Sequence, residues 1–135
     1  MRKVRCLVIT PFDPAGKRIQ DTIQRALSEM EIEPLLIDEV VSPGALLENA
    51  ISDAIRSADF IVADVTRNNP NVTYEIGIAH GLRKPVIPIV STDANSGLPS
   101  YLAGYQYIAY DPKNLRSLAT NIQRVARAFT ERNRG

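Results

Sequence analysis

Short apolar runs alternate along the chain with longer stretches in which apolar residues recur at helical spacing. The runs, rich in aliphatic and aromatic residues, predict buried strands at residues 4–9, 34–37, 60–63, 86–90 and 105–110. Apolar residues three or four positions apart predict helices at residues 17–30, 42–57 and 72–82, and a terminal helix capped by Asp111 and Pro112. Predicted strands and helices therefore follow one another along the chain.

This alternation indicates an α/β fold. Five strands and four helices, joined by connections long enough for crossovers, predict a single doubly wound parallel sheet with helices on both faces. The flavodoxin-like strand order 2-1-3-4-5 fits best, and in such sheets ligands bind outside the carboxyl ends of the strands at the topological switch point. We therefore expect a site in the loops that begin at Thr10, Asp38 and Asp64.

Composition narrows the class of protein. With 135 residues, 44% hydrophobic and 23% charged, residues 1–135 are expected to form one globular domain. A net charge of +1 argues against a nucleic acid polymer or an anionic membrane as partner. The single cysteine and single histidine predict neither a disulfide nor a metal site, and the expected location is the cytoplasm. No apolar stretch approaches the ~18 residues of a membrane span.

Glu75 stands out within the predicted helix 72–82. It lies three residues after Val72 and four before Ala79, so its carboxylate shares the face that should pack on the sheet. Partial burial and the positive end of the helix dipole push the pKa of such a group in opposite directions. Glu75 is therefore either a first-turn glutamate that stabilises its own helix or a functional carboxylate directed into the cleft.

The loop before this helix is crowded with polar side chains. Asn69 followed by Pro70 is typical of a helix cap. A cap needs only one asparagine, however, and Asn71, Asp64 and Thr66 lie close by in the sequence. Two interpretations of these polar residues are equally good. They either cap the helix and form the turn, or they contact the hydroxyl groups of a ligand.

Three segments carry a resemblance to a known group of proteins: ADFIVADVT at 58–66, NPNVTYEIGIAH at 69–80 and KPVI at 84–87. Together they resemble the nucleoside 2-deoxyribosyltransferase superfamily and its TIR-like, predicted nucleotide-binding relatives. The resemblance extends over residues 4–111 and includes the Thr10-Pro11-Phe12 opening. In the catalytic members, the glutamate of a Tyr-Glu-(Leu/Ile)-Gly motif attacks the anomeric carbon of a nucleoside and releases the base, as in retaining glycosidases.

This resemblance implies a catalytic role for Glu75 as nucleophile. It also implies that substrate is bound by Thr10, Phe12, Asp38, Asp64, Thr66, Asn69 and Asn71. The catalytic relatives carry an aspartate on the preceding helix, where this chain has Ile51. Glu48, three residues earlier on the same helical face, is then the candidate second catalytic carboxylate, or else a solvated glutamate.

The implied function is cleavage of the N-glycosidic bond of a nucleoside or nucleotide, without a cofactor. Because Ile51 replaces the aspartate, a non-catalytic nucleotide-binding sensor is an alternative, and a TIR-like domain that cleaves NAD is another. Gly77 and Gly81 lie opposite the apolar arc of their helix and permit close approach of a second helix. They predict a homo-oligomer contact, unless they are merely weak helix formers.

Overall fold

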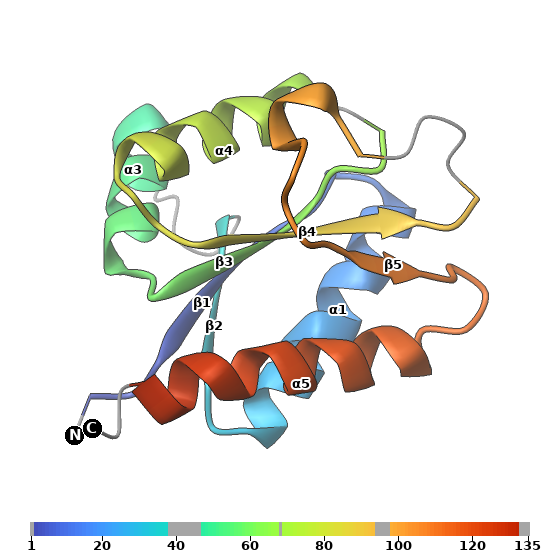
Figure 1. The fold of residues 1–135 in the computed structure, drawn as a ribbon. Coiled ribbons are helices and arrows are strands. Elements are labelled where there is room, and N and C mark those ends of the chain that lie inside the picture. Colours follow the sequence, from blue (N-terminus) through green and yellow to red (C-terminus); the bar gives the residue numbers. More distant parts are fainter. Residues whose placement is uncertain (1, 38–46, 68, 94–97, 133–135) are drawn as a thin grey trace.

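Five parallel strands form the sheet in the computed structural model, which describes residues 2–37, 47–67, 69–93 and 98–132 (Figure 1). The strand order is β2-β1-β3-β4-β5, as predicted. The strands are β1 (Arg5–Ile9), β2 (Glu33–Leu36), β3 (Phe60–Asp64), β4 (Val86–Ser91) and β5 (Ile108–Tyr110).

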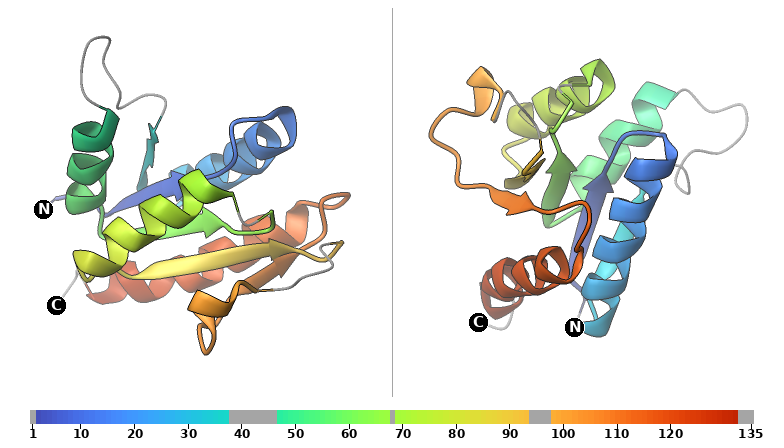
Figure 2. Two further views of the ribbon diagram at one scale, coloured as in Figure 1. Left: turned by 90° about the horizontal axis from the view of Figure 1, so that it is seen from above. Right: turned by 90° about the vertical axis from the view of Figure 1, so that its right-hand side faces the viewer.

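Helices cover both faces of this sheet (Figure 2). One face carries α1 (Pro14–Glu29) and α5 (Arg116–Arg132). The other carries α3 (Leu47–Ser57), α4 (Pro70–Gly81) and the short 3-10 helix η1 (Ser100–Leu102). The doubly wound, flavodoxin-like α/β fold is therefore confirmed. Within the described parts of the chain, no helix is both long and apolar enough to cross a membrane.

Two helices begin earlier than their apolar patterns predict, because polar residues cap them. Asp13 precedes α1, and its Oδ1 accepts the backbone N–H of Gly16 at 2.7 Å. Asn69 precedes α4, and its Oδ1 accepts the N–H of Asn71 at 2.8 Å. The predicted helix start at Ser42 lies outside the described residues.

The predicted cap of the terminal helix is wrong. Asp111 accepts the N–H of Lys113 in a turn, and α5 begins only at Arg116, whose N–H faces Asn114 Oδ1 at 3.3 Å. The proline after Asp111 suggested a first helical turn, but the bridge between Asp111 and Asn114 holds this segment in a tight turn instead. The fifth strand is also shorter than predicted, since residues 105–107 lie before it.

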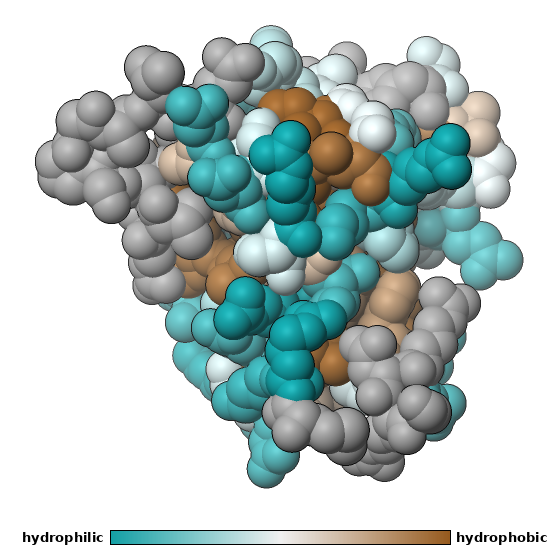
Figure 3. Space-filling view, turned by 90° about the vertical axis from the view of Figure 1, so that its left-hand side faces the viewer, coloured by the Kyte–Doolittle hydropathy of each residue, from teal (hydrophilic) through white to brown (hydrophobic). Residues whose placement is uncertain are grey.

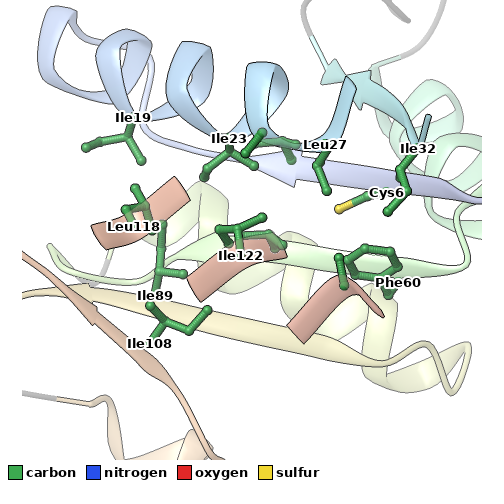
Figure 4. Packing of buried hydrophobic residues seen from close by; sticks show 14 of the residues in the cluster. Cys6, Ile19, Ile23, Leu27, Ile32, Phe60, Ile89, Ile108, Leu118 and Ile122 are labelled. Carbon is green, nitrogen blue, oxygen red and sulfur yellow. The ribbon is translucent and has the colours of Figure 1, made fainter. Parts of the chain in front are cut away.

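Side chains along the strands alternate between two hydrophobic clusters. Even-numbered residues of β1 and β3 face α1 and α5, in a cluster that includes Cys6, Val8, Phe60 and Val62 (Figure 4). Odd-numbered residues face α3 and α4, in a cluster that includes Leu7, Ile9, Ile61 and Ala63. Side chains alternate in this way along any β-strand, so the alternation determines toward which face of the sheet each residue at the carboxyl edge points. Seen from the amino ends of the strands, the surface is mainly hydrophilic, with separate apolar areas (Figure 3).

Two glycines in helices are expected to respond oppositely to substitution by alanine. A Cβ at Gly16 would collide with the carbonyl oxygen of Pro11, so Gly16→Ala should destabilise the protein by at least about 1 kcal/mol. A Cβ at Gly77 meets open space, so Gly77→Ala should stabilise it by about 1 kcal/mol through helix propensity. Urea unfolding of both variants measures this difference. If both variants changed the free energy of unfolding in the same direction, the close approach of the Pro11 carbonyl to Gly16 would be contradicted.

Candidate active site

A buried hydrogen-bond network joins the carboxyl ends of β3, β4 and β5. Asp64, the last residue of β3, is 5% exposed, and its Oδ2 accepts the hydroxyl of Tyr110 at 2.6 Å. Its Oδ1 accepts both the N–H of Thr66, at 3.0 Å, and the Thr66 hydroxyl, at 2.6 Å. The Thr66 Oγ1 accepts in turn the N–H of Ser91, at 2.9 Å. Each of these strand ends is thereby held in place relative to the others.

Burial raises the pKa of the Tyr110 hydroxyl, and its hydrogen bond to Asp64 raises it further. Tyr110 therefore remains a protonated donor at every physiological pH. A hydrogen bond to a charged acceptor contributes more to stability than one between neutral groups.

Tyr110→Phe is expected to lower the free energy of unfolding by about 2 kcal/mol, because Asp64 Oδ2 stays buried and loses its donor. Tyr107→Phe is the matched control, since Tyr107 is 51% exposed and should tolerate the change. Urea denaturation of both variants measures the difference. Equal stability of the two would mean that the Tyr110–Asp64 hydrogen bond contributes nothing.

This network borders a cavity of about 450 Å³ on the α1 and α5 side of the sheet. An ion pair between Arg67, from the β3–α4 loop, and Asp13, the cap of α1, lies at the same cavity. The loops on the two sides of the switch point are therefore linked directly. The polar residues of the lining are Asp13, Arg18, Asp64, Thr66, Arg67, Ser91, Asp93 and Tyr110.

Glu75 lies apart from that cavity, in the second turn of α4. It is 4% exposed and shares the buried face of the helix with Val72, Ile76 and Ala79. Burial raises the pKa of its carboxyl group from 4.5 to about 7. Within the described part of the chain, no hydrogen bond or ion pair joins Glu75 to another side chain. Residue 75 therefore packs inward, as predicted, but the cavity at the carboxyl edge, into which the sequence analysis directs its carboxylate, is lined by other residues.

The strand alternation separates the predicted site residues. Thr10 and Asp64 lie on the α1 side of the sheet. The Thr10 hydroxyl lies 3.5 Å from Gln20 Oε1 on that helix, and Asp64 lines the cavity together with Ile19 of α1. Glu75 instead shares the face of α4 whose neighbours Val72 and Ile76 belong to the cluster on the opposite side of the sheet. Thr10, Asp64 and Thr66 thus form one group at the carboxyl edge, and Glu75 belongs to a second.

The remaining predicted site residues do not gather at one place in the described structure. Phe12 is 70% exposed, and Asn71 is exposed in the first turn of α4. Asn69 acts as the cap of α4, which is one of its two predicted roles. Asp38 and the side chain of Glu48 lie outside the described residues. Ile51, where the resemblance implies an aspartate in the catalytic members, is 4% exposed and packs in the cluster beneath α3 and α4.

The predicted set of site residues leaves out three polar participants at the carboxyl edge: Tyr110, Ser91 and Arg67. Tyr110 and Ser91 each end a strand, so the switch-point rule could have included them. The ion pair of Arg67 with Asp13 joins residues 54 positions apart, and nothing in the local sequence indicates it. Across the described segments, no group of three or more histidine, cysteine, aspartate or glutamate side chains could hold a metal ion.

The fold is similar to that of a TIR domain, a CMP N-glycosidase and a 2-deoxyribosyltransferase. The TIR domain of the Toll-related receptor TRR-2 from Hydra magnipapillata superposes with a TM-score of 0.69 at 18% identity, covering 94% of this chain and 97% of that one. Clostridium botulinum CMP N-glycosidase, BcmB, has a TM-score of 0.67 at 19% identity, covering 90% and 98%. The 2-deoxyribosyltransferase of Bacillus psychrosaccharolyticus has a TM-score of 0.65 at 13% identity, covering 86% and 90%.

These neighbours match the superfamily that the sequence resembles. At such low identities the likeness establishes a shared fold and leaves the activity of this chain to be argued from its own residues. Comparison with protein-family models finds no match, and comparison with curated protein sequences finds none either.

Proposed function

We propose that this protein cleaves the N-glycosidic bond of a nucleoside or nucleotide, with Glu75 as nucleophile. The observation that carries the proposal is a carboxylate buried to 4% exposure on α4, at the position where the resembling enzymes have their catalytic glutamate. Burial without a compensating charge is costly for an ionised group, and such strained placements occur mainly at functional sites. The fold shared with CMP N-glycosidase and 2-deoxyribosyltransferase supports the same class of reaction.

The proposed reaction has two steps. The ionised Glu75 carboxylate attacks the anomeric carbon, and the bond between that carbon and the base nitrogen breaks with its electron pair leaving on the base. The base takes up a proton, and Glu75 is left as a glycosyl ester. Water then hydrolyses the ester to the free sugar, or a second base accepts the sugar. A negative charge beside the cationic, oxocarbenium-like transition state stabilises it electrostatically.

A pKa near 7 suits Glu75 to this role. About half of the molecules carry the ionised, nucleophilic form at neutral pH. Desolvation also makes a carboxylate more reactive than one in bulk water. We further propose that Glu48 assists departure of the base and that substrate contacts come from Thr10, Phe12, Asp38, Asp64, Thr66, Asn69 and Asn71.

One observation favours a second candidate, a non-catalytic nucleotide sensor. Ile51 is packed in the core at the position of the relatives' aspartate, so it offers no proton to a departing base. A TIR-like activity on NAD is a third candidate, which the fold shared with a TIR domain supports. We also propose that residues 1–135 act as one cytoplasmic domain that forms homo-oligomers.

Incubation of the purified chain with nucleosides, their monophosphates and NAD tests these candidates. The proposed enzyme releases free base, which chromatography detects. A sensor raises its melting temperature with a nucleotide without any base release, because a ligand that binds only the folded state stabilises it. Release from NAD alone would favour the TIR-like candidate.

A further inference from the structure

Cations without partners concentrate along α5 and the neighbouring part of α1. Within the described residues, no ion pair or hydrogen bond engages the exposed side chains of Arg25, Lys113, Arg116, Arg124 and Arg127. Of the other described arginine and lysine side chains, only Lys3 and Arg83 lack a partner. The rest contact a carboxylate or a backbone carbonyl, as Arg2 does with Asp59. Uncompensated positive charge is therefore a property of this one face.

A groove of about 390 Å³ lies on this face, between α1 and the start of α5, which run side by side (Figure 2). Its lining includes the cations Arg25, Lys113 and Arg116 and the apolar residues Ala26, Leu115 and Ala119. The apolar residues are buried or half-buried and the cations are exposed, so an apolar floor has a cationic rim. The acidic residue of the lining is Glu29, whose Oε2 already accepts from Gln123 at 2.9 Å.

The cations at the start of α5 are placed against the dipole of that helix. The first turn of a helix carries partial positive charge, so acidic side chains stabilise it and basic ones do not. The first turn of α5 contains no acidic residue, and the helix begins at Arg116. Lys113 lies three residues before it and lines the same groove. A negative charge from outside the described chain would relieve this repulsion.

The positive charge continues along the outer side of α5. At about 100° per residue, Arg116, Arg124 and Arg127 fall within an arc of about 80°. Arg116 and Arg127 are eleven residues apart, a distance of about 16 Å along a helix. An extended peptide of about five residues spans that length.

We propose that the groove and this row of arginines together dock an acidic segment of a partner protein. One apolar side chain of the segment fills the groove, and its carboxylates pair with the surrounding cations. The apolar floor favours a peptide over a nucleic acid, whose phosphate backbone has no apolar side chain to place there. A membrane fits less well, because the exposed large hydrophobic residues of the described chain lie outside α1 and α5, at Phe12, Tyr74, Tyr105 and Tyr107.

The docking surface does not depend on the proposed reaction. Arg116 and its neighbours belong to the helices on one face of the sheet, whereas Glu75 packs on the other face. Loss of base release would therefore leave the docking intact, and loss of docking would leave base release intact.

The probe is a fluorescent peptide, acetyl-Glu-Asp-Leu-Glu-Asp-amide, and its anisotropy measures binding to the full chain. We expect saturable binding that weakens as salt is added, because salt screens exposed charges. Replacing the central leucine of the peptide by serine should weaken binding about threefold, since the groove then receives no apolar group. Arg116→Glu should weaken binding about tenfold, because a carboxylate repels the acidic peptide.

Arg56→Glu is the matched control, because Arg56 is exposed on α3, on the opposite face of the sheet, and the change in charge is equal. It should leave peptide binding unchanged. Thermal unfolding separates docking from folding. Arg116→Glu should raise the melting temperature by about two degrees, since a carboxylate in the first turn interacts favourably with the helix dipole, while peptide binding falls.

Several outcomes would overturn the docking of an acidic segment. They are no saturable binding of the peptide, binding that survives Arg116→Glu, and equal weakening by Arg56→Glu. Tighter binding of a single-stranded oligonucleotide of the same charge, or of phosphatidylserine vesicles, would assign the surface to another class of partner.

Discussion

Replacement of Glu75 by glutamine is expected to reduce base release at least about a thousandfold. The amide has nearly the size of the carboxylate, so the packing of α4 should survive. It is a poor nucleophile, however, and it carries no negative charge to stabilise a cationic transition state. The measurement is free base against time at a saturating concentration of the nucleoside or nucleotide that the wild-type protein cleaves.

Glu131→Gln is the matched control for this substitution, because Glu131 lies exposed near the end of α5. It should leave the rate unchanged. In wild type, kcat/KM should fall about tenfold for each pH unit below about 7, as Glu75 takes up its proton. Base release by Glu75→Gln at the wild-type rate would remove Glu75 from the mechanism.

The same carboxyl group is expected to make stability depend on pH. In the folded chain Glu75 keeps its proton up to about pH 7, whereas in the unfolded chain it loses it near 4.5. The folded state therefore binds more protons in this window, and the free energy of unfolding must fall as pH rises through it. At about 1.4 kcal/mol for each pH unit, the loss is as much as about 3 kcal/mol by neutral pH.

Glu75→Gln lacks this ionisation, so its stability relative to wild type should rise from pH 4.5 to pH 7 and then level off. Urea unfolding of both proteins at several pH values measures the difference. Asp59 titrates in the opposite sense, because Arg2 lowers its pKa, and its contribution is lost only as the medium becomes acidic. The contribution of Asp59 is the same in wild type and in Glu75→Gln, so it cancels in the difference between their free energies of unfolding. A difference independent of pH would show that Glu75 ionises normally in the folded state.

Much of the fold was predictable because each element carries its own local signal. The run 60–63 is apolar at every position, as a strand buried on both faces must be, and β3 is buried throughout. The apolar period of residues 17–30 located α1, and only its first turn was missed, since a cap acts through a side chain outside the period. The terminal helix start was wrong because a turn and a first helical turn share the same residue types.

The burial of Glu75 was likewise a consequence of local geometry. Residues three and four apart share a face of a helix, so Val72 and Ala79 already imply that residue 75 packs inward. The size of the rise in its pKa cannot be predicted from this local pattern, because it depends on every group that surrounds the carboxyl group in the folded protein.

The sequence by itself determined the order of elements, the buried faces of the helices and the inward position of one glutamate, since all of these follow from short-range periodicity. Only the tertiary structure decided that Asp64 accepts from Tyr110, that Arg67 pairs with Asp13, and that the side-chain nitrogen of Gln20 has no hydrogen-bond partner among the described residues. It also decided that Thr10 and Asp64 face α1 while Glu75 packs on the other side of the sheet. Such contacts depend on residues from distant parts of the sequence lying within a few ångströms of one another. A local sequence pattern cannot predict them, because it carries no information on which distant residue will be close.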